Sequence, residues 1–178
     1  KLIYNAGNNA FSHQQDLNEL ARAIQNVDTI ICHEPWWNGS ARWADIVLGA
    51  TTTIERNDIS SAGTYSIDKV YAMKQVIAPQ NDALDDFEIF RRLAVLCGVE
   101  YAFTEGKTQM DYVKAAYEAS SASKHTPFDK FWAEGMARIP VPKEAHQWVR
   151  HGDFRADPVK NPLHTTSYGT GELILAAL

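Results

Sequence analysis

The stretch Thr29-Ile30-Ile31-Cys32-His33-Glu34-Pro35-Trp36-Trp37 decides the fold class. It opens on a continuous, largely β-branched run, which is typical of a parallel strand covered on both faces. Leu2-Ile3-Tyr4 is a shorter apolar run, and the turn-forming residues Gly7-Asn8-Asn9 follow it closely. Both runs therefore predict strands that end in polar loops.

An amphipathic helix is predicted between these two strands. Its apolar residues recur at i, i+3, i+4 and i+7, and Asp16 is in place to cap the first turn. The apolar positions are Leu17, Leu20, Ala21 and Ile24. Strand, helix and strand make a βαβ unit, so the sequence predicts an α/β fold with a Rossmann-like parallel sheet and flanking helices.

Further strands and a short helix are predicted to extend this unit. Ser40 to Asp45 reads as a short helix, Ile46-Val47-Leu48 as a third buried strand, and Val70 to Val76 as a candidate fourth strand.

Past Pro79 the pattern becomes mainly helical. Residues 85–97 form a helical pattern with an acidic start and Gly98 as its stop, and Thr108-Gln109-Met110-Asp111 is a capping box. Thr126-Pro127-Phe128-Asp129 predicts another helix start, with proline at the first helical position. We therefore divide a single domain into a nucleotide-binding core over 1–78, helices over 79–138 and an extended, proline-interrupted arm over 139–178.

Composition limits the possible classes. The chain has 178 residues, a formal net charge of −5 and 45% hydrophobic residues, enough for one sizeable core without disulfides or metals. No apolar run approaches the length of a membrane span, and the acidic balance argues against a nucleic-acid partner.

Cys32 and Cys97 each lie in an apolar run and read as reduced core thiols, with one disulfide as the alternative. The opening at Lys1 is more typical of a piece of a longer protein than of a natural N-terminus.

Candidate binding residues follow the predicted strands, because ligands of open α/β sheets bind beyond the carboxyl ends of the strands. Gly7-Asn8-Asn9 would let backbone N–H groups approach a phosphate or a planar base. Glu34 stands where a dinucleotide fold places the carboxylate that accepts from ribose hydroxyls or a guanine N–H edge. The alternatives are an ordinary turn, a structural His33, and Trp36-Trp37 as core or interface packing. There is no G-x-G-x-x-G after the first strand, so a standard NAD site is disfavoured.

Read as strings, these clusters resemble the molybdenum oxotransferases that reduce S- and N-oxides, namely the dimethyl sulfoxide, trimethylamine N-oxide and biotin sulfoxide reductases. Residues 7–16, GNNAFSHQQD, resemble the family's GGNPFxHHQD loop, and residues 33–37, HEPWW, resemble its HEPWW or HDFQW segment. Residues 41–59 are similar to its ARHADIVLPATTxxERNDI run, and residues 85–90 to SDFDIF. The resemblance extends through residues 103–106, 131–135 and 153–158 to about Ser167.

The resemblance implies that this chain is an internal fragment of a larger catalytic subunit, its third, Rossmann-like domain. That domain holds one of two molybdopterin guanine dinucleotides, so we expect the bis(molybdopterin guanine dinucleotide) molybdenum cofactor in the parent enzyme. The positions expected to touch the dinucleotide are Asn9, His13, His33, Glu34, Arg56 and Asp86. No catalytic residue and no metal ligand is expected in this chain, and its partners would be the remaining domains of the reductase and, for the parent, an S- or N-oxide substrate.

Several positions depart from the family pattern. Asn8 and Ala10 replace the usual Gly and Pro, Trp43 stands where His is usual, and Gly49 replaces a Pro. Residues 168–178 differ from the family's SGKIEIYS continuation.

The alternative function is an isolated, non-catalytic folded domain that binds no cofactor alone and self-associates. The parent is expected in the bacterial periplasm, or in the cytoplasm if it is of the biotin sulfoxide reductase type.

Overall fold

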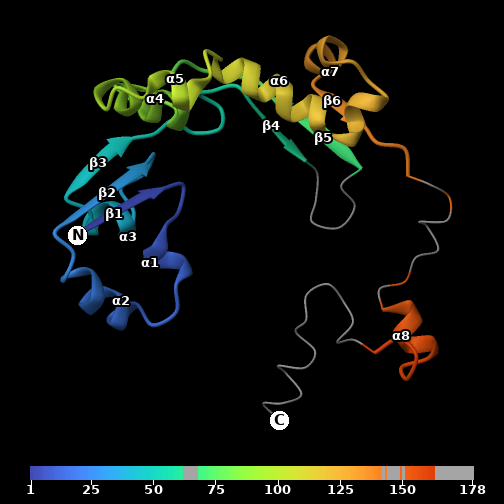
Figure 1. Ribbon diagram of the computed structural model, residues 1–178, viewed down its shortest axis with the longest axis horizontal. Coiled ribbons are helices and arrows are strands. Elements are labelled where there is room, and N and C mark those ends of the chain that lie inside the picture. Colours follow the sequence, from blue (N-terminus) through green and yellow to red (C-terminus); the bar gives the residue numbers. More distant parts are fainter. Residues whose placement is uncertain (62–67, 142, 144–148, 150, 163–178) are drawn as a thin grey trace. The chain divides into compact units, whose positions relative to one another are not determined.

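A computed structural model describes residues 1–61, 68–141, 143, 149 and 151–162. The chain forms two compact units, residues 1–139 and residues 140–178. The first unit contains the strands and most of the helices of the described residues (Figure 1).

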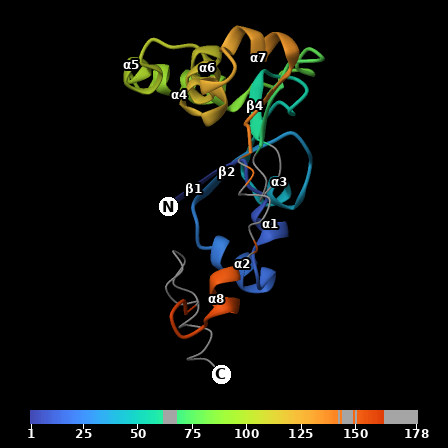
Figure 2. The same ribbon diagram turned by 90° about the vertical axis from the view of Figure 1, so that its right-hand side faces the viewer.

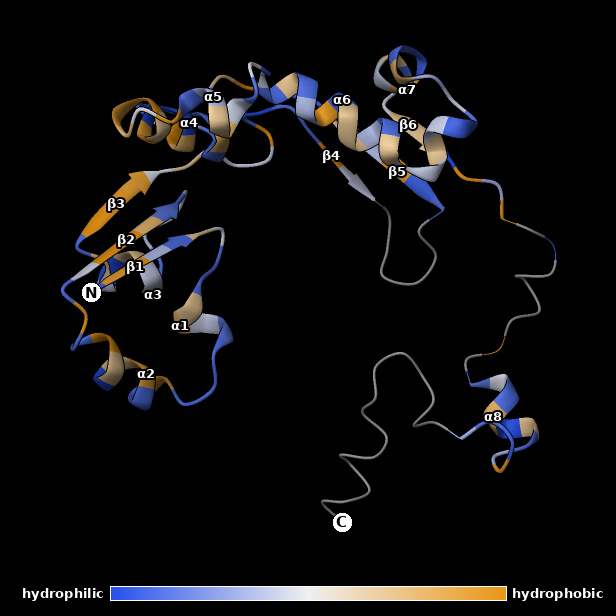
Figure 3. Cartoon of the chain, in the orientation of Figure 1, coloured by the Kyte–Doolittle hydropathy of each residue, from blue (hydrophilic) through white to orange (hydrophobic). Residues whose placement is uncertain are grey.

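The first unit begins with a three-stranded parallel sheet in the order β1-β2-β3. The register pairs Ala6 with His33 and Glu34 with Gly49, so all three strands end at one edge of the sheet. The strands are β1 (Leu2–Ala6), β2 (Thr29–Glu34) and β3 (Ile46–Gly49). The parallel sheet of the predicted βαβ unit is therefore confirmed, and Figure 3 shows the hydrophobic run along β3.

Three helices connect these strands: α1 (Ala10–His13), α2 (Leu17–Ile24) and α3 (Gly39–Trp43). Asp16 caps α2 as predicted, because its Oδ1 accepts from the Glu19 N–H at 2.9 Å. Asn38 caps α3 in the same way through the Ala41 N–H.

The predicted fourth strand exists but belongs to a different sheet. β5 (Lys69–Met73) pairs antiparallel with β4 (Asp58–Ser61) and with β6 (Met136–Arg138). The expectation that it continues the parallel sheet is wrong, because its partners satisfy its backbone groups on both sides.

Helices occupy most of the chain between β5 and β6. They are α4 (Asp86–Leu96), α5 (Glu100–Thr104), α6 (Gln109–Ala119), the 3₁₀ turn η1 (Ser121–Lys124) and α7 (Phe128–Glu134). The capping box between Thr108 and Asp111 is confirmed, and Gly98 takes a left-handed conformation after α4 with φ of +71°. At α7 the N-cap is Pro127 without a side-chain bond, so Thr126 does not cap this helix as predicted.

The main apolar cluster is formed by residues of the second sheet and of the helices above it. Helix α6 contacts β4 and α7 contacts β6. Figure 2 shows α6 and α7 close to the second sheet. Tyr117 and Phe131 are fully buried, and their rings stack with centroids 4.0 Å apart. The Tyr117 hydroxyl donates to the Thr126 carbonyl at 2.7 Å. The buried members are Val70, Tyr117, Ala122, Phe131 and Ala137.

Two burial expectations need correction. Ile46 at the start of β3 is 45% exposed, because β3 ends the sheet and is covered only in part. Cys97 is exposed and free, since it lies just past the last turn of α4, whereas Cys32 is buried and free as expected. The alternative of a disulfide is thereby excluded.

In the second unit, residues 151–162 include one short helix, α8 (Gly152–Ala156), within the segment predicted as an extended arm. The departure at residues 168–178 lies outside the described residues. No helix in the described ranges has the length and apolarity to cross a bilayer.

Candidate functional site

Two adjoining cavities open at the edge where the parallel strands end. The strand-end cavity, of about 430 Å³, is lined by residues that include Gly7, His33, Thr51, Arg56 and Asp86. The loop cavity, of about 460 Å³, is lined by residues that include Gly49, Ile54, Glu55, Gln80 and Asp82. The wall that both cavities share consists of Glu34, Pro35, Trp36, Ala50 and Thr52.

Glu34 ends β2 in this shared wall. It is half-buried, and its carboxylate has no hydrogen-bond or ion-pair partner among the described residues. Burial, and then the Glu34 charge, raise the pKa of the nearby Cys32 thiol, which keeps that side chain protonated and inert. Glu34 is thus an unused acceptor that faces two cavities.

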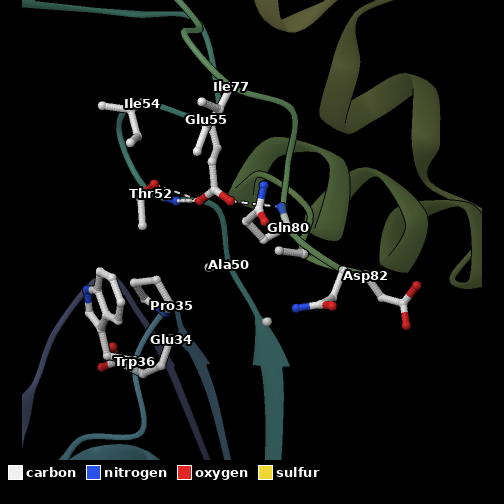
Figure 4. A pocket seen from close by; sticks show the side chains of 13 residues that line it. Glu34, Pro35, Trp36, Ala50, Thr52, Ile54, Glu55, Ile77, Gln80 and Asp82 are labelled. Atoms are coloured by element: carbon white, nitrogen blue, oxygen red, sulfur yellow. Dashed lines mark hydrogen bonds between the residues drawn. The ribbon is translucent and has the colours of Figure 1, made fainter.

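Trp36 belongs to the same wall and is 68% exposed. In the view of Figure 4, Trp36 and Pro35 lie on one side of the loop cavity and the Glu55 side chain on the other. The exposed indole offers a flat apolar surface beside the Glu34 carboxylate.

Thr51 lines the strand-end cavity and is 4% exposed. Its backbone is fully engaged, since its N–H donates to the Leu84 carbonyl at 3.0 Å and its carbonyl accepts from Arg56 Nη1 at 2.7 Å. Its Oγ1, however, is buried without a partner in the described part of the chain. A buried hydroxyl without a partner is rare, and an ordered water or a ligand group can complete its bonding.

Arg56 is fixed at the same cavity by two contacts. Besides the bond to the Thr51 carbonyl, its Nε lies 3.5 Å from Asp58 Oδ2. The guanidinium has further N–H donors, which suits it to a phosphate or a ring acceptor.

His33 and Asp86 meet directly at this cavity. His33 Nδ1 lies 2.7 Å from Asp86 Oδ1, and His33 Nε2 lies 2.7 Å from the Tyr4 hydroxyl. The His33 side chain is almost fully buried, whereas that of Asp86 is 44% exposed.

Glu55 joins the two loops that form the loop cavity. It accepts from the Thr52 N–H at 2.7 Å, the Thr52 hydroxyl at 2.6 Å and the Gln80 N–H at 2.8 Å (Figure 4). These bonds, led by the Thr52 hydroxyl, lower the pKa of the Glu55 carboxyl below its usual value. Glu55 is buried, so it is a structural hub rather than the solvated turn residue that its charged neighbours suggest.

Asn9 and His13 line neither of these cavities. Asn9 Nδ2 donates to Ser12 Oγ at 2.8 Å, and Asn9 Oδ1 accepts from the Ser40 hydroxyl at 2.9 Å. His13 is exposed, with Nδ1 3.5 Å from Asn8 Oδ1. Of the six predicted residues, the structure therefore brings four to one cavity, namely His33, Glu34, Arg56 and Asp86.

Sequence reasoning did not single out Thr51 or Tyr4. Thr51 begins a run of three threonines with no distinguishing signal, and Tyr4 reads only as an apolar strand residue. The one available signal was position. Thr51 lies two residues after the end of β3, and Glu34 is the last residue of β2, so both lie where a parallel strand ends.

The chemistry of the site follows from these groups. In the strand-end cavity the Glu34 and Asp86 carboxylates and the Arg56 guanidinium surround a half-open space with Trp36 in its wall, which suits a planar heterocycle that has N–H donors and is joined to an anionic group. No group of three or more His, Cys, Asp or Glu side chains in the described ranges is arranged to hold a metal ion. A ligand here would be held by hydrogen bonds and stacking.

Comparison with known proteins decides the family. Residues 1–95 match the molybdopterin oxidoreductase family. The chain belongs to this family. It is 48% identical over 174 residues to a trimethylamine-N-oxide reductase from Haemophilus influenzae, covering 94% of this chain and 21% of that protein. It is 42% identical over 173 residues to a dimethyl sulfoxide/trimethylamine N-oxide reductase from Cereibacter sphaeroides, with the same coverage of both chains.

A biotin sulfoxide reductase from Cereibacter sphaeroides is 42% identical over 174 residues, covering 94% of this chain and 23% of that protein. The chain thus spans about a fifth of the length of these curated relatives. Among solved structures, the acetylene hydratase from Pelobacter acetylenicus shares the fold with a TM-score of 0.59 at 19% identity, over 80% of this chain and 19% of that one.

Proposed function

We propose that this chain binds one molybdopterin guanine dinucleotide as part of a longer molybdenum-dependent S-/N-oxide reductase. The observation that carries the proposal is the pair of adjoining cavities with the Glu34 carboxylate in their shared wall, where no described residue bonds it. The names of the relatives support the reaction class. When bound, the molybdenum–pterin group supplies oxygen-atom transfer from the oxide substrate.

The residues present fit such a ligand. The buried Thr51 hydroxyl has no partner within the described part of the chain, and the strand-end cavity offers both acceptors and a cation. A pterin and a pyrophosphate need this mixture, because the ring presents donors and acceptors and the phosphates are anionic.

The charge distribution suggests an orientation. Arg56 lines the strand-end cavity, whereas the described residues that line the loop cavity include no Lys or Arg. The pterin and phosphate portion therefore belongs beside Arg56 and Asp86. The guanosine belongs in the loop cavity, where Glu34 accepts from its N–H or O–H groups and Trp36 stacks on the base.

A calorimetric titration with GDP, with NAD as comparison, tests the proposal. We expect GDP to bind and NAD to bind far more weakly. Glu34→Gln removes the charged acceptor while keeping the side-chain size, so the Kd for GDP should rise about tenfold or more. Glu118→Gln is the matched control, because Glu118 is exposed on α6 and lines neither cavity.

Equal binding of GDP and NAD would contradict the guanine preference. Unchanged GDP affinity in Glu34→Gln would contradict the assigned role of Glu34. If GDP does not bind, the guanosine half-site is not preformed in this chain and the proposal fails for the chain as it stands.

A further inference from the structure

His33 connects a strand residue to the strand-end cavity through both of its ring nitrogens. Tyr4 on β1, His33 on β2 and Asp86 on α4 form a continuous hydrogen-bonded row, with 2.7 Å at each step. The row begins at the partly buried Tyr4, passes through the buried His33 and ends at a carboxylate that lines the cavity. The Asp86 side chain, at the end of the row, is 44% exposed, whereas that of His33 is almost fully buried.

The direction of the hydrogen bonds follows from the chemistry of the end groups. An ionised carboxylate can only accept a hydrogen bond. His33 Nδ1 must therefore carry a hydrogen and donate it in the bond to Asp86 Oδ1. In a neutral imidazole Nε2 is then the acceptor, and the Tyr4 hydroxyl donates to it. Burial, and then the negative charge of Asp86, raise the pKa of Tyr4, which favours the protonated phenol that this arrangement requires.

The rings are held in place by packing. Phe90 lies one helical turn after Asp86, so α4 presents both residues on one face. The Phe90 ring centroid is 5.0 Å from that of His33 and 5.5 Å from that of Tyr4. His33 therefore has little freedom to rotate, and the carboxylate bonded to it is fixed as well.

We propose that Tyr4 and His33 are positioning residues that hold the Asp86 carboxylate as an oriented hydrogen-bond acceptor for the N–H groups of a planar heterocycle in the strand-end cavity. His33 acts through Asp86 and presents almost no surface of its own to a ligand. This inference rests on the proposed function, since it assigns roles within the same site. A purely structural role, in which the row only docks α4 on the sheet, makes different predictions.

The first test reads the His33 tautomer in the unliganded wild-type chain by long-range ¹H–¹⁵N NMR correlation. The proposal requires a single tautomer with the proton on Nδ1 and Nε2 unprotonated. In Asp86→Ala, which removes the acceptor for Nδ1–H, this tautomer should lose its uniqueness. In Tyr4→Phe, which keeps the ring and removes only the hydroxyl, Nδ1 should keep its proton because Asp86 still accepts from it, and the ¹⁵N shift of Nε2 should change because it loses its donor. Tyr112→Phe is the matched control, because the Tyr112 hydroxyl donates to the Thr104 carbonyl at 3.0 Å and Tyr112 lines neither cavity.

The second test compares affinity with stability in the same variants. For binding, 6-hydroxymethylpterin and GDP are titrated separately by calorimetry, and Tyr4→Phe should raise the Kd of the pterin about three- to tenfold. Asp86→Asn should raise it at least as much. Tyr112→Phe should leave it unchanged, although both tyrosine variants lose one hydroxyl bond and should have similar unfolding midpoints.

The outcomes separate this inference from the proposed function. A proton on Nε2 in the wild-type chain overturns the inference whether or not any ligand binds. Equal pterin affinity in Tyr4→Phe and wild type also overturns it and leaves the row as a docking contact for α4. If the His33 tautomer is as required but neither pterin nor GDP binds, the hydrogen-bonded row exists as described, the proposed function fails, and the role of the row in ligand binding fails with it.

Discussion

Replacing Thr51 by valine should stabilise the free protein and weaken its binding to a ligand in the strand-end cavity. Thr51 is 4% exposed and its hydroxyl has no partner among the described residues. Removing a buried hydroxyl that makes no bond recovers part of its desolvation cost, which is about 1–3 kcal/mol. Since valine has nearly the same shape, we expect a gain of about 1 kcal/mol, or about 2–4 °C in Tm for a chain of this length.

The neighbouring threonine provides a control of opposite sign. The Thr52 hydroxyl donates to the Glu55 carboxylate at 2.6 Å, so Thr52→Val removes a bond to a charged acceptor. Its loss should cost about 1.5–3 kcal/mol. The two substitutions are chemically identical and one residue apart, yet the structure predicts that they shift stability in opposite directions.

Urea unfolding of wild type and both variants measures these free energies, and titration with 6-hydroxymethylpterin measures binding. Thr51→Val should raise the Kd of the pterin by about two- to tenfold, because the ligand loses the hydroxyl that it would otherwise satisfy. If Thr51→Val destabilises the chain as much as Thr52→Val, the Thr51 hydroxyl has a partner in the folded protein and the reasoning is refuted.

Three further predictions concern the rest of the first unit. Because the pKa of Glu55 is lowered, its carboxylate stabilises the fold fully above the ordinary pKa of 4.5, and this contribution is lost as the pH falls through the lowered pKa. Glu55→Gln should therefore be less stable than wild type at neutral pH. Urea unfolding should show that the difference in unfolding free energy between the two proteins narrows below pH 4.5. Phe131→Ala should cost about 3–5 kcal/mol, since Phe131 is fully buried against Tyr117, and a cost below about 1 kcal/mol in chemical unfolding would show that this core is not close-packed. A maleimide should label the exposed Cys97 rapidly and the buried Cys32 only on unfolding, and mass spectrometry of the native protein would contradict this by finding both thiols modified at similar rates.

The sequence predicted those helices and strands whose formation depends on neighbouring residues in the chain. The apolar periodicity and the Asp16 cap predicted α2, and the β-branched run predicted β2, because both depend on neighbouring residues in the chain. The pairing of β5 with β6 could not be predicted in this way, since β6 lies far along the sequence and no local pattern indicates the pairing. The sequence also did not predict that Cys97 is exposed. Helical periodicity assigns Cys97 to the apolar face of α4, but it does not show whether other elements still cover that face beyond the last helical turn.

The candidate site divides along similar lines. The strand-end rule located His33 and Glu34, since parallel strands end at one edge whatever their loops do. Arg56 and Asp86 came only through the family resemblance, and the structure brings both to the strand-end cavity. Thr51 escaped because its distinction is an unsatisfied hydroxyl, a property of packing that a sequence does not display.

The start of α4 makes two adjacent aspartates unequal. Asp85 is the N-cap and accepts from the Glu88 N–H at 2.9 Å, which leaves Asp86, the first helical residue, to bond His33. Successive helical residues point about 100° apart, so moving the helix start one residue later would make Asp86 the N-cap and turn its carboxylate away from His33. Loss of the Asp85 side chain would therefore do more than weaken the helix cap. Asp86 would become the nearest residue able to cap α4, and the change in the helix start would rotate the Asp86 carboxylate in the strand-end cavity.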